Sequence, residues 1–446
     1  MSTDDAGAGS RPPLLPLRFR RLSLGERRAA LEGVFGAEEA EREATYCTPA
    51  LAELADVMVE SAVGSLPVPL GVATGYVVDG EELAVPLATE EPSVVAASSF
   101  AARLVAQVGG FTSWAAEPVM TAHVYLEGVS AEREERLRLV EAELESALAG
   151  CLRSMRGRGG GFRGMGVLRL PETGLVRVEI RVDVRDAMGA NLLNTAAERA
   201  RPLLEAESGG RALMCILSNS ARHRLAGARF AMPVGNLGFV APTGVPAPEL
   251  ARRVALASEA AREDPERAVT HNKGIMNGIS ALALATGNDT RALEAAAHAW
   301  ACRDGRCRGL SRFTLVAGAA GPELRGEIEL PLPLGSLGGS VGFHPASSFS
   351  LRLLGRPSAA RLARIAASCG LAQNLAALLA LTGEGIQKGH MRLHAARLAW
   401  RAGARGDEIP RLAALLASGL AERGSMDSGE AARLLEELRR PGGARR

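Results

Sequence analysis

The sequence lacks the features that mark secreted, metal-binding and membrane proteins. Its six cysteines are scattered along the chain, and no Cys-x-x-Cys pair predicts a zinc or redox motif. No apolar run reaches the roughly 18 residues that span a bilayer. The first residues, MSTDDAGAGSRPP, are acidic and small where a signal peptide has a basic start and an apolar run. We therefore expect a cytoplasmic protein with free thiols and no membrane partner.

Length and charge narrow the class further. A chain of 446 residues is too long for one compact core, so we expect two or three structural units. Hydrophobic residues make up 47% of the sequence, which is enough to build those cores. The 52 Lys and Arg residues are balanced by 50 Asp and Glu residues, so no large positive field is available to hold a nucleic-acid backbone. The composition disfavours a nucleic-acid partner.

Residues 117–220 show an ordered series of hydrophobic patterns. The series predicts six elements: strand PVMTAHVYLEG, a helix from Ser130, strands 167–170 and 175–184, a helix from about Met188 to Glu205, and strand 212–218. The first helix places four apolar residues on one face: Leu137, Val140, Leu144 and Leu148. The order β-α-β-β-α-β predicts a ferredoxin-like unit.

The segments on either side mix Ala- and Leu-rich helical patterns with short strand patterns at 327–331 and 349–354. Because they flank a self-contained unit, we expect one larger, discontinuous domain. The predicted fold is α+β and has three parts: a large domain of residues 1–115 and 229–385, an inserted ferredoxin-like domain of residues 116–228, and a C-terminal helical flap of residues 386–446. A glycine-rich junction precedes the flap and is a candidate hinge: Gly383, Gly385 and Gly389.

The segment DVRDAMGAN (183–191) leads from a strand pattern into a helix through Gly189. The N–H groups and the positive end of a helix bind phosphate, and a glycine lets a ligand approach closely. A glycine at such a turn often serves the backbone alone, and the Gly-x-Gly-x-x-Gly fingerprint of the Rossmann fold is absent. The segment by itself is a weak indication of phosphate binding.

Two further segments carry candidate charges. THNKGIMNG places Lys273 beside glycines, which predicts a glycine-rich loop with a cation for a developing oxyanion; a solvated surface lysine is the alternative. ATGNDTRALEAAAHA predicts a turn that leads into a helix, with Asp289 or Asn288 as its N-cap. A role as helix N-cap is by itself enough to explain why an aspartate stands at this position.

EEPSVVAA places two carboxylates before a proline and a probable helix, so one acid is a candidate helix cap. The other, Glu91, is a candidate proton donor if burial keeps it protonated. EGIQKGHMRLHAAR places His390 and His394 on one helical face, a spacing also found in zinc sites. Position 391 is Met where a zinc protease of the His-Glu-x-x-His type has its general base, so we expect no metal.

Together these segments resemble the catalytic motifs of 3-hydroxy-3-methylglutaryl-CoA reductases, and more closely those of the bacterial class II enzymes than those of the membrane-anchored eukaryotic ones. The motifs EEPSVVAA, DVRDAMGAN, HNKGIMNG, TGND and GHM stand in the family's order and at similar spacing from about Phe19 to Leu438. The resemblance implies an enzyme that interconverts 3-hydroxy-3-methylglutaryl-CoA with mevalonate and CoA, using two NADPH or NADH. It also implies at least a homodimer.

The resemblance assigns catalytic roles to four residues: Glu91, Lys273, Asp289 and His390. It implies that Lys273 stabilises the thioester oxyanion and that Asp289 keeps Lys273 charged and oriented. It implies that His390 protonates the departing CoA thiolate and that Glu91 supplies the proton for the second reduction.

The resemblance also implies two sets of ligand contacts. The substrate set is Ser93, Asn219, Arg267, Asn277 and, near the CoA phosphates, Arg20; the dinucleotide set is Asp186, Gly189 and Asn191. An arginine fork such as that of Arg267 suits the free carboxylate of the substrate. Two departures stand out, since the family's Glu-Asn-Val-Ile-Gly appears as ESAVG (60–64) and Trp114 replaces a usually smaller residue.

The stretch CLRSMRGRGGGFRG (151–164) bears on the choice of nicotinamide. In NADH-using relatives we expect an acid about seven residues before the glycine run, where it binds the ribose 2′-hydroxyl and repels a 2′-phosphate. Here that position is Leu152, and Arg153 follows it. The sequence therefore favours NADPH, with Arg153 as a phosphate contact; a solvated basic loop is the alternative.

Two other classes of function stay open at this point. A non-catalytic CoA- or nucleotide-binding protein of the same fold would have lost one of the four catalytic residues, and all four are present. A zinc hydrolase would need a third ligand beside His390 and His394, for which the sequence offers no candidate.

Overall fold

The computed structural model describes residues 21–35, 39, 48–240, 245–319, 321–383, 395–423 and 427–440. The chain divides into two compact units, Met1–Pro69 and Leu70–Arg446. The first unit contains α1 (Leu24–Phe35) and α3 (Pro49–Met58), and an ion pair of the buried Arg27 with Asp56 joins these two helices.

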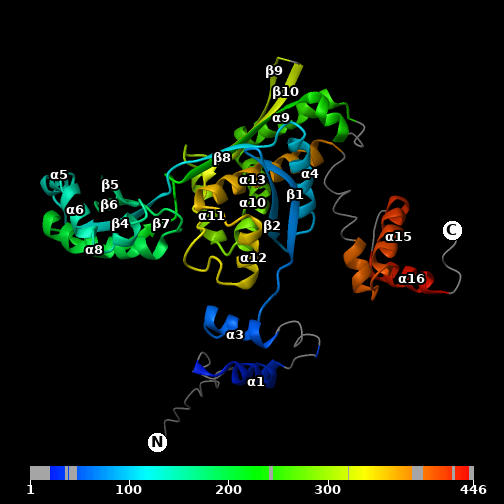
Figure 1. The fold of residues 1–446 in the computed structure, drawn as a ribbon, viewed down its shortest axis with the longest axis horizontal. Coiled ribbons are helices and arrows are strands. Elements are labelled where there is room, and N and C mark those ends of the chain that lie inside the picture. The colour runs from blue at the N-terminus through cyan, green and yellow to red at the C-terminus, as the bar shows by residue number, and fades with distance from the viewer. Residues whose placement is uncertain are drawn as a thin grey trace, which may run out of the picture. The chain divides into compact units, whose positions relative to one another are not determined.

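The second unit contains three antiparallel sheets and most of the helices (Figure 1). Its strands are β1 (Leu70–Val78), β2 (Glu81–Ala88), β3 (Thr112–Ala115), β4 (Val119–Glu127), β5 (Gly161–Arg169), β6 (Val176–Asp183), β7 (Arg211–Ser218), β8 (Leu225–Pro233), β9 (Ser311–Gly318) and β10 (Gly321–Pro331). Its helices are α4 (Val94–Ala106), α5 (Ala131–Leu137), α6 (Glu141–Leu148), α7 (Arg153–Arg156), α8 (Ala190–Ser208), α9 (Ala247–Glu263), α10 (Pro265–Ala285), α11 (Thr290–Ala301), α12 (Pro345–Leu353), α13 (Ala359–Thr382), α15 (Glu408–Arg423) and α16 (Ser428–Arg439), with a 3₁₀ segment η2 (Val234–Val240). Helices and antiparallel sheets confirm the predicted α+β class.

The ferredoxin-like order predicted for residues 117–220 is present in the structure. The strands pair in the order β5-β6-β4-β7, and α5, α6 and α8 lie along one face of that sheet (Figure 1). Side chains of β6 alternate between this covered face, which holds Val178 and Ile180, and the opposite face, which holds Glu179 and Arg181. A period of two residues placed one hydrophobic face under the helices, so local pattern and tertiary structure agree here.

The first predicted helix of this unit is interrupted. It breaks at Val140 into α5 and α6, because Val140 has a φ of −92° and a ψ of 21°, outside helical geometry. The four apolar side chains that predicted the helix are nevertheless all buried: Leu137, Val140, Leu144 and Leu148. The hydrophobic face was predicted correctly, and the break in the backbone was not.

A second sheet, in the order β3-β8-β10-β9, packs against α13, which also contacts α4, α9 and α10. By length and composition α13 is the one described helix apolar enough to cross a membrane, but 78% of its most apolar 18-residue window is buried inside this fold. Three polar residues interrupt its apolar run and are buried with it: Ser368, Gln373 and Asn374. Helix α13 is the central core helix of this part of the chain.

The strand predicted at 349–354 is wrong, because residues 349–353 belong to helix α12 and Leu354 is its C-cap. His344 caps this helix by accepting the N–H of Ala346 at its side chain, and Pro345 occupies the first turn. A cap followed by proline favours a helix start over a strand. The strand predicted at 327–331 lies within β10.

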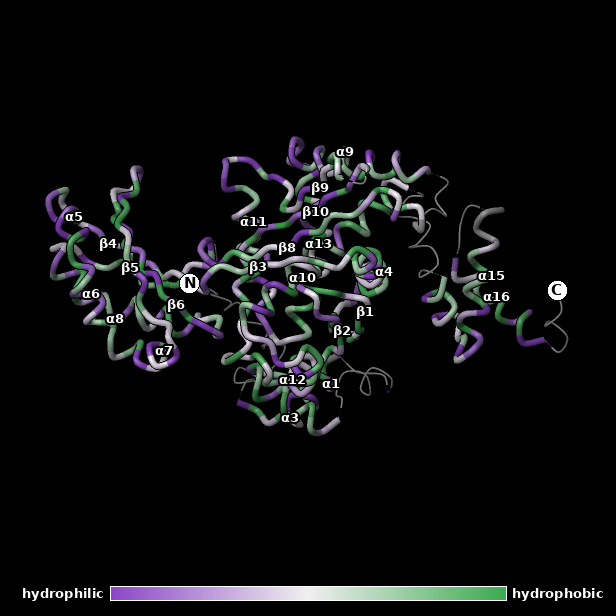
Figure 2. The backbone as a smooth tube through the Cα atoms, turned by 45° about the horizontal axis from the view of Figure 1, so that its top comes forward, coloured by the Kyte–Doolittle hydropathy of each residue, from purple (hydrophilic) through white to green (hydrophobic). Residues whose placement is uncertain are grey.

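The described C-terminal residues form helices, as predicted, and have a hydrophobic cluster of their own. Its buried members are Ala395, Leu398, Ala399, Ala404, Leu412, Leu416, Ala431 and Leu435. Hydrophobic and hydrophilic residues alternate along α15 and α16, which suits helices with one buried face (Figure 2). Most of the glycine-rich junction proposed as a hinge, including Gly385 and Gly389, lies outside the described residues.

Candidate active site

The charged residue pair best suited to acid–base chemistry joins two segments that lie far apart in the sequence. Lys273 Nζ lies 2.6 Å from Glu91 Oε2, and Asn277 Nδ2 donates a hydrogen bond of 3.2 Å to Glu91 Oε1. Lys273 and Asn277 are four residues apart on α10, so they share one helical face. The carboxylate therefore receives a cation and an amide from one helix.

The glycine-rich loop predicted around Lys273 is wrong, since these residues form the middle of helix α10. Gly278 allows α10 to approach α13, because a Cβ there would lie 3.1 Å from the carbonyl oxygen and the Sγ of Cys369. Gly274 has open space where its side chain would be. A helix with an interior glycine is about 1 kcal/mol less stable than one with alanine, and burial between neighbouring elements overrides that local preference.

A cavity of about 330 Å³ opens beside the Glu91–Lys273 pair. It brings together five of the predicted site residues: Glu91, Ser93, Arg267, Lys273 and Asn277. The guanidinium of Arg267 makes no ion pair or hydrogen bond with any residue in the described part of the chain, so it is available to an anion. The cavity thus offers two cations, Lys273 and Arg267, to a negatively charged ligand.

Ser93 lies at the start of α4 in a left-handed conformation, with a φ of 74°. It occupies the N-cap position, but its side chain makes no capping hydrogen bond. The prediction that one acid of EEPSVVAA caps this helix is therefore wrong. Because the left-handed conformation is unfavourable for serine, its presence at a cavity wall is typical of a functional site.

Asp289 is placed differently from the expectation that it holds Lys273. Its Oδ1 accepts the N–H groups of Arg291 and Ala292 at 3.0 and 3.1 Å, so it caps α11. No ion pair between Asp289 and Lys273 occurs among the described residues, and Asp289 Oδ2 has no partner there. A second cavity of about 370 Å³ extends from Glu91 and Lys273 to Thr290, next to Asp289.

Two residues that the sequence reasoning missed anchor the helix directly before Lys273. His271 Nε2 lies 2.7 Å from Ser311 Oγ, and both groups are buried. Asn272 accepts the N–H of Leu310 at 2.8 Å and donates to the carbonyl of Arg308 at 2.9 Å. Burial lowers the pKa of His271 to about 3, with a further contribution from the Arg267 guanidinium, so this imidazole is neutral.

One sequence signal would have strengthened the assignment of Lys273. Only two of the 52 Lys and Arg residues are lysines, Lys273 and Lys388, so arginine fills almost every other cationic position. If position 273 needed only a solvated positive charge, we would expect arginine there, as at the other cationic positions. The scarcity favours a specific requirement for a primary amine at Lys273.

The turn DVRDAMGAN has the predicted path from β6 through Gly189 into α8. Gly189 has a φ of 91°, and a Cβ there would lie 2.6 Å from a methyl carbon of Val184. No side chain caps α8 and its first turn has no acid, so its N–H groups suit a phosphate. Asn191 is exposed in this first turn.

Asp186 is tied to the large domain. Its Oδ1 accepts the N–H of Ala359, the first residue of α13, at 2.7 Å, and its carbonyl accepts the N–H groups of Ser336 and Leu337 at 2.8 and 3.1 Å. Asp186 therefore fixes the glycine turn to α13. It also borders a cavity of about 520 Å³.

Leu152, the position aligned with an acid in NADH users, is fully buried in the inserted unit. Leu152 therefore offers no polar group to a dinucleotide, and the position that discriminates the two cofactors stays a prediction. Arg153 is exposed on α7, and its guanidinium has no partner among the described residues. Its neighbour Arg156 is paired with Glu145 at 2.7 Å.

Three predicted site residues are not brought to the Glu91–Lys273 cavity. Asn219 is exposed in the turn after β7, outside both cavities that border Lys273. His390 and Arg20 lie outside the described residues, as does His394.

Comparison with known proteins identifies a family that this chain resembles. Residues 23–395 match the family model described as hydroxymethylglutaryl-coenzyme A reductase. A 3-hydroxy-3-methylglutaryl-coenzyme A reductase from Archaeoglobus fulgidus is 39% identical over 404 residues, which cover 89% of each chain. A probable enzyme of the same name from Borreliella burgdorferi is 39% identical over 76% of each chain. A solved class II reductase from Streptococcus pneumoniae, bound to NADPH in open conformations, is 40% identical, has a TM-score of 0.72, and aligns with 94% of this chain and 100% of its own.

Proposed function

The chain belongs to the hydroxymethylglutaryl-coenzyme A reductase family, and from this membership we propose that the cavity at Glu91 and Lys273 is where 3-hydroxy-3-methylglutaryl-CoA is reduced to mevalonate and CoA. The observation that carries the proposal is the 2.6 Å contact between Lys273 and Glu91 in the wall of that cavity. A half-buried acid in contact with an exposed cation provides a proton donor and an oxyanion partner together.

We propose that Lys273 stabilises the negative charge that develops on the thioester oxygen. Its side chain is 60% exposed, so a substrate oxygen can replace Glu91 as the partner of the ammonium group. His271 and Asn272 fix the backbone before Lys273, which limits the reorganisation needed during reaction. Asp289 is proposed to support the charge of Lys273 through its unpartnered Oδ2.

Proton delivery is proposed to be divided between two residues. The hemithioacetal of mevaldehyde releases a CoA thiolate when it collapses, and His390 is proposed to protonate that thiolate. Glu91 is proposed to protonate the alkoxide formed from mevaldehyde in the second reduction. Asn277 holds Glu91 Oε1, so Oε2 stays directed toward Lys273 and the reacting oxygen.

Substrate binding is proposed to depend first on Arg267. Its unpartnered guanidinium borders the cavity and suits the free carboxylate of the substrate. Ser93 and Asn277 border the same cavity and are proposed to bind substrate hydroxyl or carbonyl groups. Asn219 and Arg20 stay as predictions of substrate and CoA contacts.

The uncapped start of α8 and the turn at Gly189 fit a dinucleotide pyrophosphate, and we propose that Gly189, Asn191 and the anchoring Asp186 form its binding turn. When bound, the cofactor supplies one hydride to each reduction. The S. pneumoniae enzyme is described as bound to NADPH, which supports NADPH for this chain as well. Arg153, exposed and without a described partner, is proposed to bind the 2′-phosphate.

The cofactor proposal predicts a change of preference in one variant. Arg153→Asp should lower the ratio of kcat/KM with NADPH to that with NADH by about 10- to 100-fold, because it removes one charge-assisted bond to the phosphate. Arg156→Asp is the matched control, since Arg156 already pairs with Glu145. An equal change in both variants would assign the effect to the general charge of α7.

Three larger features are also proposals. The residue ranges 1–115 with 229–385, 116–228 and 386–446 are proposed as the substrate and CoA domain, the dinucleotide domain and a flap that brings His390 to the site. The active form is proposed to be a homodimer or larger homo-oligomer. A cytoplasmic location stays a prediction.

The direct test is to follow NADPH and NADH absorbance with 3-hydroxy-3-methylglutaryl-CoA, and then in reverse with mevalonate and CoA. We expect turnover with two cofactor molecules used per substrate. His390→Gln should block reduction of the thioester and spare reduction of added mevaldehyde, which has no thiolate to release. Ligand binding without turnover would instead support a non-catalytic CoA-binding protein.

A further inference from the structure

The connection between α11 and β9 contains two cysteines at opposite positions of a closed loop. Its sequence, CRDGRC, runs from Cys302 to Cys307. The N–H of Arg308 donates to the carbonyl of Ala301 at 3.0 Å, so the residues that flank the two cysteines are hydrogen-bonded to each other. Inside the loop, the N–H of Gly305 donates to the carbonyl of Cys302 at 3.0 Å and closes a turn. This closure places Cys302 and Cys307 across from each other.

The two thiols differ in accessibility, as the two members of an oxidisable pair do. Cys302 is exposed, whereas Cys307 is half-buried. Burial raises the pKa of Cys307, and a hydrogen bond with the neighbouring Cys302 thiol raises it further. The loop carries charges of both signs, since Arg308 Nε lies 3.9 Å from Asp304 Oδ2. An exposed thiol is the one that an oxidant in solution reaches first.

The other cysteines that the structure describes are less suited to oxidation. Burial raises the pKa of the Cys151 and Cys215 thiols, which are half-buried. Cys369 is fully buried. Among the described cysteines, Cys302 is thus the one with an exposed side chain.

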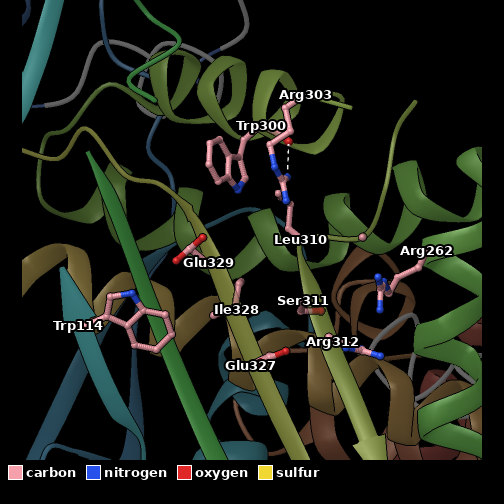
Figure 3. A pocket seen from close by; sticks show the side chains of 11 residues that line it. Trp114, Arg262, Trp300, Arg303, Leu310, Ser311, Arg312, Glu327, Ile328 and Glu329 are labelled. Atoms are coloured by element: carbon pink, nitrogen blue, oxygen red, sulfur yellow. Dashed lines mark hydrogen bonds between the residues drawn. The ribbon is translucent and has the colours of Figure 1, made fainter. Parts of the chain in front are cut away.

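The loop is connected to the helix that carries Lys273. Asn272 directly precedes Lys273. Its Nδ2 donates a hydrogen bond to the carbonyl of Arg308 at 2.9 Å and lies 4.0 Å from Cys307 Sγ. At the other end of the loop, the Arg303 guanidinium lies 4.3 Å from the centre of the Trp300 ring. It also donates a hydrogen bond to the Trp300 carbonyl (Figure 3). The loop is therefore hydrogen-bonded to the residue directly before Lys273.

We propose that Cys302 and Cys307 form a reversible intramolecular disulfide that adjusts the position of Lys273 and so regulates the enzyme. The oxidant is a hydroperoxide such as hydrogen peroxide. The Cys302 thiolate attacks one peroxide oxygen, the O–O bond breaks, and the released hydroxide takes a proton to become water. The Cys307 thiolate attacks the sulfenic sulfur, the S–O bond breaks, and the second oxygen leaves as water. Two thiols lose two electrons, and the peroxide gains them.

The test uses the full-length protein, reduced, freed of reductant and treated with hydrogen peroxide. The intact mass of the monomer should fall by about 2 Da, and trypsin, which cleaves after the intervening arginines, should release two peptides joined through Cys302 and Cys307. We expect kcat to fall by about threefold or more and to recover with dithiothreitol, since a small displacement near a reacting group lowers the rate strongly.

The double variant Cys302→Ser/Cys307→Ser should keep its starting kcat in peroxide, whereas Cys151→Ser/Cys215→Ser should still lose and recover activity. Absence of the cross-linked peptides, or a bond between two chains in their place, would overturn the disulfide. A disulfide that forms with kcat unchanged would overturn the regulatory role. Because the mass measurement does not depend on turnover, failure of the disulfide is distinguishable from failure of the proposed reductase chemistry.

Discussion

Two glutamates of the second unit contact cations in opposite surroundings. Glu91 lies 2.6 Å from Lys273, with 34% of the glutamate side chain and 60% of the lysine side chain exposed. Glu179, on β6, lies 2.6 Å from Arg222 and 3.6 Å from His123 Nε2, with 7% of its side chain exposed. Cavities border the first pair, whereas protein groups surround the second glutamate on most sides.

The difference separates an ion pair that we propose is used for chemistry from one that stabilises the fold. An exposed pair contributes about 0–1 kcal/mol to stability, so a ligand can displace one partner at little cost to the fold. A buried carboxylate that loses its partner is left uncompensated. The nearby His123 imidazole, and then the Arg222 charge, hold the pKa of Glu179 at about 2, which keeps it ionised and in place.

Replacing the proposed catalytic cation should give the largest effect. Lys273→Ala should lower kcat by about 100-fold or more, because it removes the proposed oxyanion partner while Arg267, the other cation of the cavity, is proposed to hold the substrate carboxylate. Its free energy of unfolding should change by less than about 1 kcal/mol. The measurements are steady-state kinetics and denaturant unfolding.

The matched control for this variant is Arg252→Ala. Arg252 makes an exposed pair with Glu249 at 2.8 Å, and that glutamate is 34% exposed, as Glu91 is. The Arg252→Ala variant should leave kcat unchanged. A Lys273→Ala enzyme that kept more than about a tenth of its kcat would remove Lys273 from the proposed role.

Removing the charge of the buried glutamate should reverse the pattern. Glu179→Gln should lower the free energy of unfolding by about 1.5–3 kcal/mol, the contribution of hydrogen bonds to a charged group. Its effect on kcat should be far smaller than that of Lys273→Ala. Glu145→Gln serves as the control, since Glu145 pairs with Arg156 in the same inserted unit while 51% exposed. Equal stability losses in the two variants would refute the distinction by burial.

The smallest effect concerns stability in acid. The folded pKa of Glu179, about 2, lies below the value of about 4.3 for an unfolded glutamate, so the unfolded chain binds the proton first as pH falls. The stabilisation by Glu179 is complete above about pH 4.3 and disappears as pH falls toward 2. The stability difference between the natural chain and Glu179→Gln should therefore shrink over this range. A constant difference from pH 5 to 2.5 would contradict the shifted pKa.

Local patterns predicted the inserted unit well because its elements satisfy their own hydrophobic periods. The alternation of β6 and the apolar face of the first helix correspond to buried side chains in the structure. The break at Val140 was not visible, since the same apolar spacing continues through it. Pattern fixes which face is buried, and it does not report every change of backbone direction.

The sequence predicted which residues line the candidate active site, and it did not predict how they are arranged. The motifs named Glu91, Ser93, Arg267, Lys273 and Asn277, and one cavity brings them together. They also suggested a loop at Lys273 and a direct contact with Asp289, whereas the structure has a helix and an Asp289 that caps α11. His271 and Asn272 were overlooked because their partners, Ser311 and Leu310, lie about 40 residues further along the chain.

By itself the sequence determined the family, the α+β class and the order of elements in residues 117–220, because motif residues and hydrophobic periods are local properties. It also named the side chains that we propose are catalytic. Only the tertiary structure decided that Gly274 and Gly278 lie in a helix, since the packing of α10 against α13, which Gly278 allows, outweighs the weak helix propensity of glycine. It also decided which glutamate is available to a substrate. Glu91 and Glu179 are chemically identical, and only the solvent and the partners that the fold places around each one leave the first accessible and the second enclosed.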